Sequence, residues 1–183
     1  MIEQAEIIRE KGTNRSRFFR GQVDKYTWVD LGSSYLPSDI LAAFLYAQLE
    51  SYPQIQAQRQ QAWEFYAHQL DDWCKNNHVG MPYIPPECEQ PYHMFYLLLP
   101  SLEARTRLIE HLKARGILAV FHYLPLHKSE MGQRYGGQPG DCPVTEDISD
   151  RLLRLPLFKD LDQPTLEYIV ESVMAFQIDK SFG

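Results

Sequence analysis

The chain has 183 residues, of which 44% are apolar and 23% charged, a composition typical of a globular protein rather than a disordered, fibrous or membrane chain. With 18 Lys and Arg against 24 Asp and Glu, the formal net charge of −6 argues against a nucleic-acid partner. The longest apolar run, Phe95 to Pro100, is far below the roughly 20 residues that cross a bilayer, and no apolar signal core opens the chain, so we expect a cytoplasmic protein without a membrane partner.

The first part of the chain is predicted to be one helix followed by a long aromatic loop. Residues 2–10 have a helix-like pattern, and Gly12 is placed to end the helix. Because nothing before this helix could pack against it, we expect the sequence to be part of something longer. Residues 13–36 have no helical period and are rich in arginine and aromatic residues, which predicts an ordered loop rather than a passive linker.

Two helical segments are predicted next. Ser38 has the position of an N-cap residue, and apolar residues at helical spacing follow it to about Glu50. After Pro53 a second segment runs to about Lys75, with apolar residues along one side and Gln and Arg along the other.

The remaining residues predict an α/β layer. Tyr92–Leu99 and Ile117–Phe121 read as short apolar strands, and Ser101 caps a helix between them that closes at Gly116. A loop to Pro143 follows, then a short helix from Thr145 and an edge strand over 154–158 bounded by Pro156. Asp162 is predicted to cap a final helix. The buried stripe expected on that helix consists of Leu166, Ile169, Val170, Val173 and Met174.

Residues 15–20 and 24–28 interleave cations with aromatic side chains. Such a pattern can hold phosphates or stack on a base, but a solvated loop or an interface arm has the same composition. From the residues alone, a small phosphorylated ligand and an interface role both remain open.

Histidines and cysteines give weaker signals. His122 and His127 follow a predicted strand, yet Pro125 between them prevents both imidazoles from lying on one helix face, so hydrogen-bonding roles are favoured over a metal site. His93, inside an apolar run, is expected to be a core histidine whose ring nitrogens have hydrogen-bond partners. The three cysteines form no C-x-x-C pair, and neither a disulfide framework nor a zinc site is indicated.

Seven motifs resemble those of the DegT/DnrJ/EryC1/StrS sugar aminotransferases, in order and at that family's spacing. They lie at residues 5–15, 19–28, 32–39, 47–50, 92–96, 120–127 and 151–158. The resemblance covers essentially the whole chain but only the C-terminal half of the family's length. It implies an α/β fold, the C-terminal part of a fold type I pyridoxal-phosphate aminotransferase. Residues 1–37 would be the tail of the large domain with an interface loop, 38–76 connecting helices, and 77–183 a small α/β domain.

The resemblance also implies a reaction. Family members are homodimers that bind pyridoxal 5'-phosphate, and the motifs point to transfer of an amino group from glutamate to the 4-keto carbon of dTDP-4-keto-6-deoxyglucose, in the synthesis of lipopolysaccharide or another surface polysaccharide. The family's Schiff-base lysine precedes the matched part, and no lysine here lies in an S-x-K-N type setting. We therefore expect no catalytic residue in this chain and neither transamination nor cofactor binding by it alone. The alternative is a truncated, non-catalytic dimerisation or binding module that self-associates through the apolar sides of 38–75.

The resemblance assigns binding roles residue by residue. Ser34 stands where many relatives carry an asparagine that reaches the neighbouring subunit's cofactor phosphate, and its hydroxyl can donate the same hydrogen bond. Ser33 and Tyr35 accompany it in the cofactor-binding set. The residues implied to approach the nucleotide-sugar are Arg20, Lys25, Tyr26 and Trp28, together with His122, Tyr123 and His127 of the small-domain loop.

Overall fold

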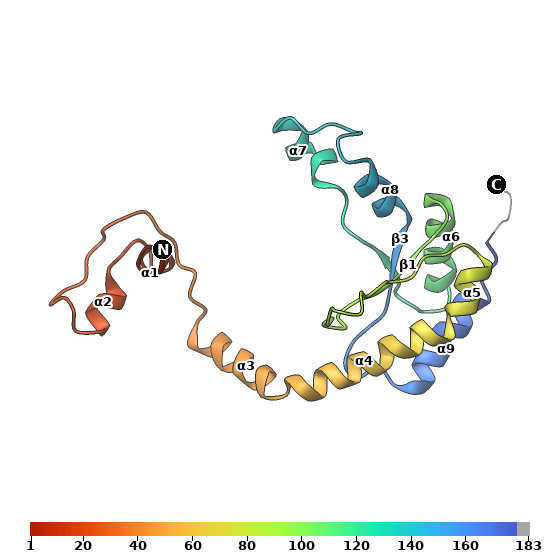
Figure 1. The fold of residues 1–183 in the computed structure, drawn as a ribbon, viewed down its shortest axis with the longest axis horizontal. Coiled ribbons are helices and arrows are strands. Elements are labelled where there is room, and N and C mark those ends of the chain that lie inside the picture. The colour runs from red at the N-terminus through yellow and green to blue at the C-terminus, as the bar shows by residue number, and fades with distance from the viewer. Residues whose placement is uncertain (179–183) are drawn as a thin grey trace. The chain divides into compact units, whose positions relative to one another are not determined.

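The computed structural model describes residues 1–178 and divides them into two compact units, which meet in the sequence between Tyr52 and Pro53. The elements of both units are labelled in Figure 1. The domain boundaries predicted after residues 37 and 76 stay predictions. The last part of the predicted 77–183 domain, with Lys180, lies outside the described residues. None of the helices in 1–178 is both long and apolar enough to cross a bilayer.

The N-terminal unit contains the helices α1 (Ile2–Arg9), α2 (Arg15–Phe19) and α3 (Asp39–Glu50). After α1 the chain turns through left-handed conformations at Lys11 and Gly12, with φ values of 63° and 73°, which confirms the predicted helix and the glycine that follows it. The expectation that 13–36 has no helix is wrong. Because α2 is only five residues long, it shows no helical period in the sequence.

The segment that leads into α3 folds back along the end of α1. The Ser33 N–H donates to the Ile8 carbonyl at 2.9 Å, and the Lys11 N–H donates to the Ser33 carbonyl at 3.1 Å. Two glycines make this approach possible, because a Cβ on Gly32 would overlap the backbone of Gly12 and a Cβ on Gly12 would overlap the Asp30 carbonyl. The two segments are therefore in backbone contact.

Helix α3 begins at a cap that the sequence identified. The Ser38 hydroxyl accepts a hydrogen bond from the Leu41 N–H at 3.3 Å, as predicted. No residue of α3 is buried in this chain, although the helix is apolar on most of its surface. Its large exposed apolar side chains are Ile40, Leu41, Phe44, Leu45, Tyr46 and Leu49.

The C-terminal unit is built on a three-stranded antiparallel sheet of order β1-β3-β2 (Figure 1). The strands are β1 (Phe95–Leu98), β2 (Val120–Phe121) and β3 (Leu152–Leu155). Phe95 lies opposite Leu155 on one side of β3, and Val120 lies opposite Arg154 on the other. The helices of this unit are α4 (Tyr52–Gln69), α5 (Asp71–Asn76), α6 (Leu102–Lys113), η1 (Leu126–Lys128), α7 (Glu130–Arg134), α8 (Pro143–Arg151) and α9 (Gln163–Met174).

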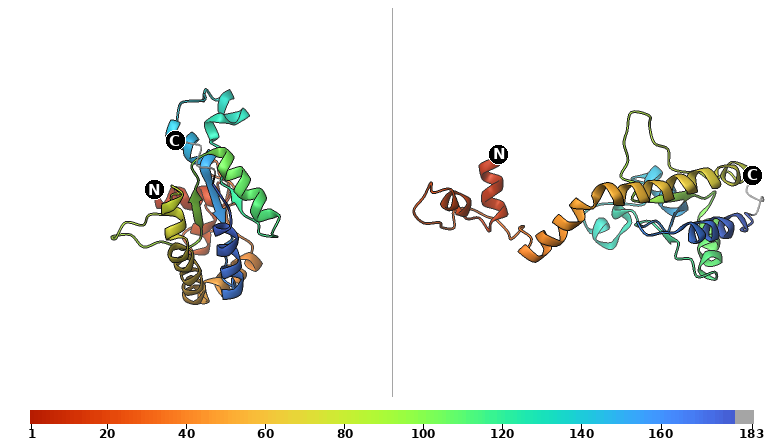
Figure 2. Two further views of the ribbon diagram at one scale, coloured as in Figure 1. Left: turned by 90° about the vertical axis from the view of Figure 1, so that its right-hand side faces the viewer. Right: turned by 90° about the horizontal axis from the view of Figure 1, so that it is seen from below.

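The core of this unit joins the sheet to helices α4, α5, α6 and α9. Helices α4 and α9 run side by side in Figure 2, and both contribute buried residues to one cluster. The Phe95 ring lies 5.4 Å from the Trp63 ring and 5.3 Å from the Tyr66 ring, and the Tyr66 hydroxyl donates to the Pro156 carbonyl at 2.9 Å. Burial raises the pKa of the Cys74 thiol to about 12, so this cysteine packs as an apolar residue.

Several predicted elements of this unit are confirmed by their caps. The Ser101 hydroxyl accepts from the Ala104 N–H at 3.1 Å at the start of α6, and the Asp162 carboxylate accepts from the Thr165 N–H at 3.0 Å at the start of α9. Helix α8 begins at Pro143, two residues earlier than predicted, because proline is accepted in the first turn of a helix. The long predicted helix after Pro53 is interrupted at Leu70, between α4 and α5.

Three further expectations are wrong. The predicted edge strand over 154–158 is the central strand β3, which ends before Pro156 and can therefore donate hydrogen bonds on both sides. His93 precedes β1 and is exposed, because the chain turns at Tyr92 with a φ of 44° instead of entering the strand there. Met174 is 49% exposed, whereas the other four residues of the expected stripe on α9 are buried.

Candidate functional site

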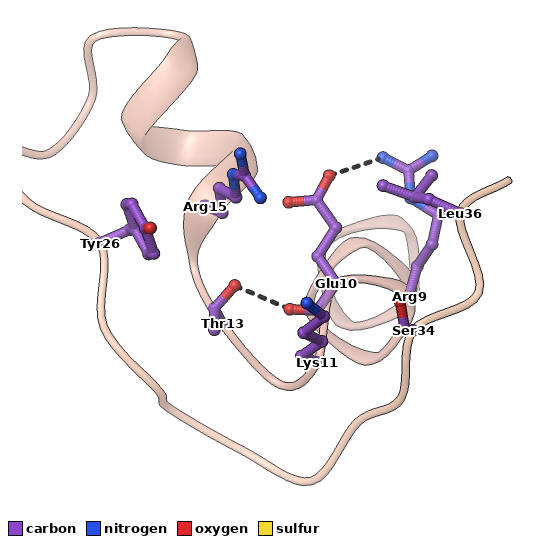
Figure 3. Close-up of a pocket in the computed structure, with 8 residues that line it drawn as sticks. All are labelled: Arg9, Glu10, Lys11, Thr13, Arg15, Tyr26, Ser34 and Leu36. Carbon is purple, nitrogen blue, oxygen red and sulfur yellow. Dashed lines mark hydrogen bonds and ion pairs between the residues drawn. The ribbon is translucent and has the colours of Figure 1, made fainter. Parts of the chain in front are cut away.

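The N-terminal unit contains a cation-lined pocket of about 270 Å³, hereafter the N-terminal pocket (Figure 3). The end of α1 and the left-handed turn supply one side of it, and the returning segment before α3 supplies the other. Its lining residues are Arg9, Glu10, Lys11, Thr13, Arg15, Tyr26, Ser34 and Leu36. Two predicted binding residues, Tyr26 and Ser34, are thus brought together.

Glu10 organises the polar side of the N-terminal pocket. One of its carboxylate oxygens lies 3.6 Å from an Arg9 guanidinium nitrogen and accepts from the Ser16 hydroxyl at 3.4 Å. Its main-chain carbonyl accepts from the Thr13 hydroxyl at 2.8 Å (Figure 3). Since one carboxylate faces the cations Arg9, Lys11 and Arg15, the lining is net positive and can hold an anion.

Arg15 also links the pocket to aromatic side chains. Its guanidinium lies 5.7 Å from the centre of the Tyr26 ring and 5.1 Å from that of Phe19. Arg9, Lys11 and Thr13 were not predicted as site residues, and Arg15 was predicted only as part of the cationic and aromatic stretch 15–20. All four lie in the family motif at residues 5–15, which was the available signal.

The other predicted residues of this unit do not line the pocket. Arg20 forms a two-pronged ion pair with Glu6, at 2.8 and 2.7 Å, and this pairing lowers the pKa of Glu6 and raises the pKa of Arg20. The remaining predicted residues are exposed, namely Lys25, Trp28, Ser33 and Tyr35.

The C-terminal unit holds a second cavity of about 330 Å³, hereafter the C-terminal pocket. It lies where the chain leaves β2 and β3. Its lining residues are His93, Met94, Leu118, Val120, His122, Arg154, Leu155, Pro156 and Leu157. Of the three residues predicted on the small-domain loop, only His122 is among them, and Tyr123 is 80% exposed.

His127 is held away from the C-terminal pocket by an acidic partner. Its Nε2 lies 2.8 Å from Oε1 of Glu146, and the same oxygen accepts from the Gly140 N–H at 2.6 Å. The other carboxylate oxygen, Oε2, lies 3.5 Å from the Lys128 ammonium. The Glu146 carboxylate therefore joins the start of α8 to the loop after β2. Among residues 1–178 no group of three or more His, Cys, Asp or Glu side chains is arranged to hold a metal ion.

Acidification is expected to release this loop through Glu146. The hydrogen bonds from His127 and Gly140 and the charge of Lys128 hold the pKa of Glu146 at about 2, below its ordinary value of 4.5. Because the folded-state pKa is depressed, the stabilisation is fully present above about pH 4.5 and is lost as the pH falls towards 2. The protection of the Gly140 amide, which compares its exchange rate with that of an unstructured amide at the same pH, should fall over this range. The Glu146→Gln variant should exchange fast at neutral pH, and the exposed control Glu130→Gln should behave like the wild type. An unchanged acid response in Glu146→Gln would contradict this assignment.

Several solved structures share this fold. DesV from S. venezuelae matches with a TM-score of 0.82 and 24% identity, over 97% of this chain and 45% of that one. The PLP form of Spr1654 from Streptococcus pneumoniae matches with a TM-score of 0.79 and 22% identity, over 92% and 41%. The predicted fold, part of a pyridoxal-phosphate aminotransferase, is confirmed.

The pattern of the DegT/DnrJ/EryC1/StrS aminotransferase family matches residues 1–174, and the chain belongs to this family. GDP-perosamine synthase of Escherichia coli O157:H7 is 27% identical over 174 residues, which are 91% of this chain and 45% of that protein. The pleiotropic regulatory protein of Geobacillus stearothermophilus is 31% identical over 93 residues, 50% of this chain and 25% of that protein. The chain thus spans less than half the length of each of these relatives.

Proposed function

We propose that this chain is the C-terminal part of a pyridoxal-phosphate-dependent aminotransferase that acts on a nucleotide-sugar. The amino group would pass from glutamate to the 4-keto carbon of dTDP-4-keto-6-deoxyglucose, and the working enzyme would be a homodimer. The observation that carries the proposal is the N-terminal pocket, in which Ser34 stands beside three cations within family motifs.

The N-terminal pocket fits the phosphate end of pyridoxal phosphate. The Ser34 hydroxyl and the N–H groups of Arg9 and Arg15 are donors of the kind that phosphate oxygens accept, and the net positive lining matches their charge. When bound, the cofactor supplies the electron sink for the reaction. This chain's residues would bind and orient its phosphate. Since no lysine here lies in an S-x-K-N type setting, the Schiff-base lysine would come from outside this sequence.

The exposed side chains beside the pocket suit the nucleotide-sugar. Tyr26 is 49% exposed and Trp28 73% exposed, so both rings can stack on a base or a sugar. Lys25 is exposed and can approach a diphosphate. Arg20 could do so only by giving up its ion pair with Glu6, so we rank it below Lys25.

A chimera tests this proposal. The lysine-bearing N-terminal half of a full-length family member, joined to this chain, is expected to bind pyridoxal phosphate and to transfer nitrogen from glutamate to a 4-keto nucleotide-sugar, whereas the chain alone does neither. Product formation is measured by mass spectrometry and cofactor binding by absorbance. Ser34→Ala in the chimera should weaken cofactor binding about tenfold, because a hydrogen bond to a charged group is lost.

One outcome of that experiment would favour the other candidate function. A folded, cofactor-loaded chimera that aminates no dTDP-, GDP- or UDP-linked 4-keto sugar would contradict the aminotransferase proposal. The non-catalytic dimerisation module would then be preferred. The observation that favours it is α3, whose apolar side chains are all exposed in this chain.

A further inference from the structure

We propose that the C-terminal pocket is a carboxylate-binding site, in which Arg154 and His122 hold a carboxylate group of the amino donor. This inference rests on the proposed function and assigns the amino-acid half of the reaction to this pocket. The nucleotide-sugar and the cofactor phosphate are left to the N-terminal pocket.

Arg154 is a cation with unused donors on a rigid element. It occupies the central strand β3, opposite Tyr96 of β1 and Val120 of β2, and alternates with the core residues Leu153 and Leu155. Its Nε is buried and has no hydrogen-bond partner among the described residues. One terminal nitrogen makes a long hydrogen bond of 3.4 Å to the Phe121 carbonyl. A guanidinium that is fixed by a sheet but incompletely paired has donors left for an anionic group.

His122 supplies a second donor to the same cavity. It follows Val120 by two residues, and its Nδ1 is buried without a partner among the described residues. Burial and the nearby charge of Arg154 lower the pKa of His122, so its imidazole is neutral near pH 7 and can donate one N–H. Arg154 and His122 together therefore have one positive charge, which belongs to Arg154.

The charge and lining of the pocket favour a carboxylate over a diphosphate. One guanidinium and one neutral N–H match one singly charged, planar group, whereas the N-terminal pocket has three cations for phosphate oxygens. Apolar side chains such as Met94, Leu118 and Val120 line the rest and suit the methylene groups of an amino acid. The volume of about 330 Å³ is of the size that encloses a small ligand.

Binding of L-glutamate to the full chain, followed by NMR titration, tests the proposal without requiring activity. Arg154→Gln is expected to weaken glutamate binding by about tenfold or more, because a charge-assisted hydrogen bond is lost. Arg154→Lys should restore part of the affinity, since lysine keeps the positive charge but cannot make the two parallel hydrogen bonds of a guanidinium. His122→Asn should weaken glutamate binding less than Arg154→Gln. Arg134→Gln, which removes an exposed cation of α7, is the matched control and should leave binding unchanged. Thermal unfolding of each variant separates lost binding from lost folding.

Inorganic pyrophosphate tests whether the C-terminal pocket binds a carboxylate rather than a diphosphate. Its binding should be insensitive to Arg154→Gln and reduced by Arg15→Gln. Equal glutamate affinity in wild type and a folded Arg154→Gln, loss of pyrophosphate binding instead, or no saturable glutamate binding at all would each overturn the proposal. In an active chimera, Arg154→Gln should raise the KM for glutamate while leaving the KM for the sugar unchanged. A chimera that never aminates would contradict the proposed function. The glutamate titration would still show whether the C-terminal pocket binds a carboxylate.

Discussion

Replacing Phe95 by alanine is expected to lower the free energy of unfolding of the C-terminal unit by about 3–5 kcal/mol. Phe95 is fully buried, and its ring contacts the rings of Trp63 and Tyr66 from α4. The substitution removes apolar surface at the point where the sheet meets this helix, and the rigid strand cannot move in to fill the cavity. Such a loss is a large part of the stability of an ordinary domain.

Urea unfolding followed by tryptophan fluorescence measures this effect. Trp63 and Trp73 lie in the same unit, so they report its unfolding. Phe158→Ala is the control, because Phe158 is 51% exposed and a surface substitution changes stability by only about 0.5 kcal/mol. A loss below about 1 kcal/mol for Phe95→Ala would mean that this ring does not anchor the core.

Gly32→Ala is expected to separate the returning segment from α1 and so to destroy the N-terminal pocket. The added Cβ would overlap the backbone nitrogen of Gly12 and crowd the Ile8 carbonyl. Overpacking typically costs about 1–3 kcal/mol, and here both neighbours are backbone atoms that cannot turn aside. Because Ser34 follows Gly32 by two residues, pyrophosphate binding should fall by about tenfold or more.

Two measurements check this prediction. Hydrogen exchange at the Ser33 amide should accelerate, because its bond to the Ile8 carbonyl would break. Gly21→Ala is the matched control in the same unit. Unlike Gly32, Gly21 has a positive φ, of 69°, but its Cβ would meet no atom within 4 Å, so only backbone strain of about 1–2 kcal/mol is added. Retained protection of Ser33 in Gly32→Ala would contradict the steric argument.

Local signals in the sequence identified the ends of helices well. Ser38, Ser101 and Asp162 were each predicted as N-caps, and each accepts a hydrogen bond from the residue three positions later. These interactions depend on neighbouring residues alone, so the sequence contains all the information they need. The family resemblance added the region of the N-terminal pocket, because Ser34 and Tyr26 both lie in matching motifs.

Features that depend on distant residues could not be predicted in this way. The position of β3 in the middle of the sheet follows from pairing with residues far along the chain, and the apolar run that ends at Pro156 looks the same at an edge. The approach of Arg154 to His122 has the same origin, since the two are brought together by strand pairing. Similarly, no local pattern indicated that Glu6 would pair with Arg20 or Glu146 with His127.

The order β1-β3-β2 has a consequence for how the C-terminal unit assembles. Neither outer strand pairs with the other. Until residues 152–155 have been synthesised, β2 has no strand partner and β1 has only the bridge between Leu98 and Gly80. On the ribosome, the Phe95 ring can meet Trp63 and Tyr66 of α4 early, but the edge of β1 that pairs with β3 stays unpaired until residues 152–155 emerge. Closing such long loops slows folding and prolongs the exposure of aggregation-prone apolar segments. This unit should accordingly depend more on chaperones during synthesis than its small sheet suggests.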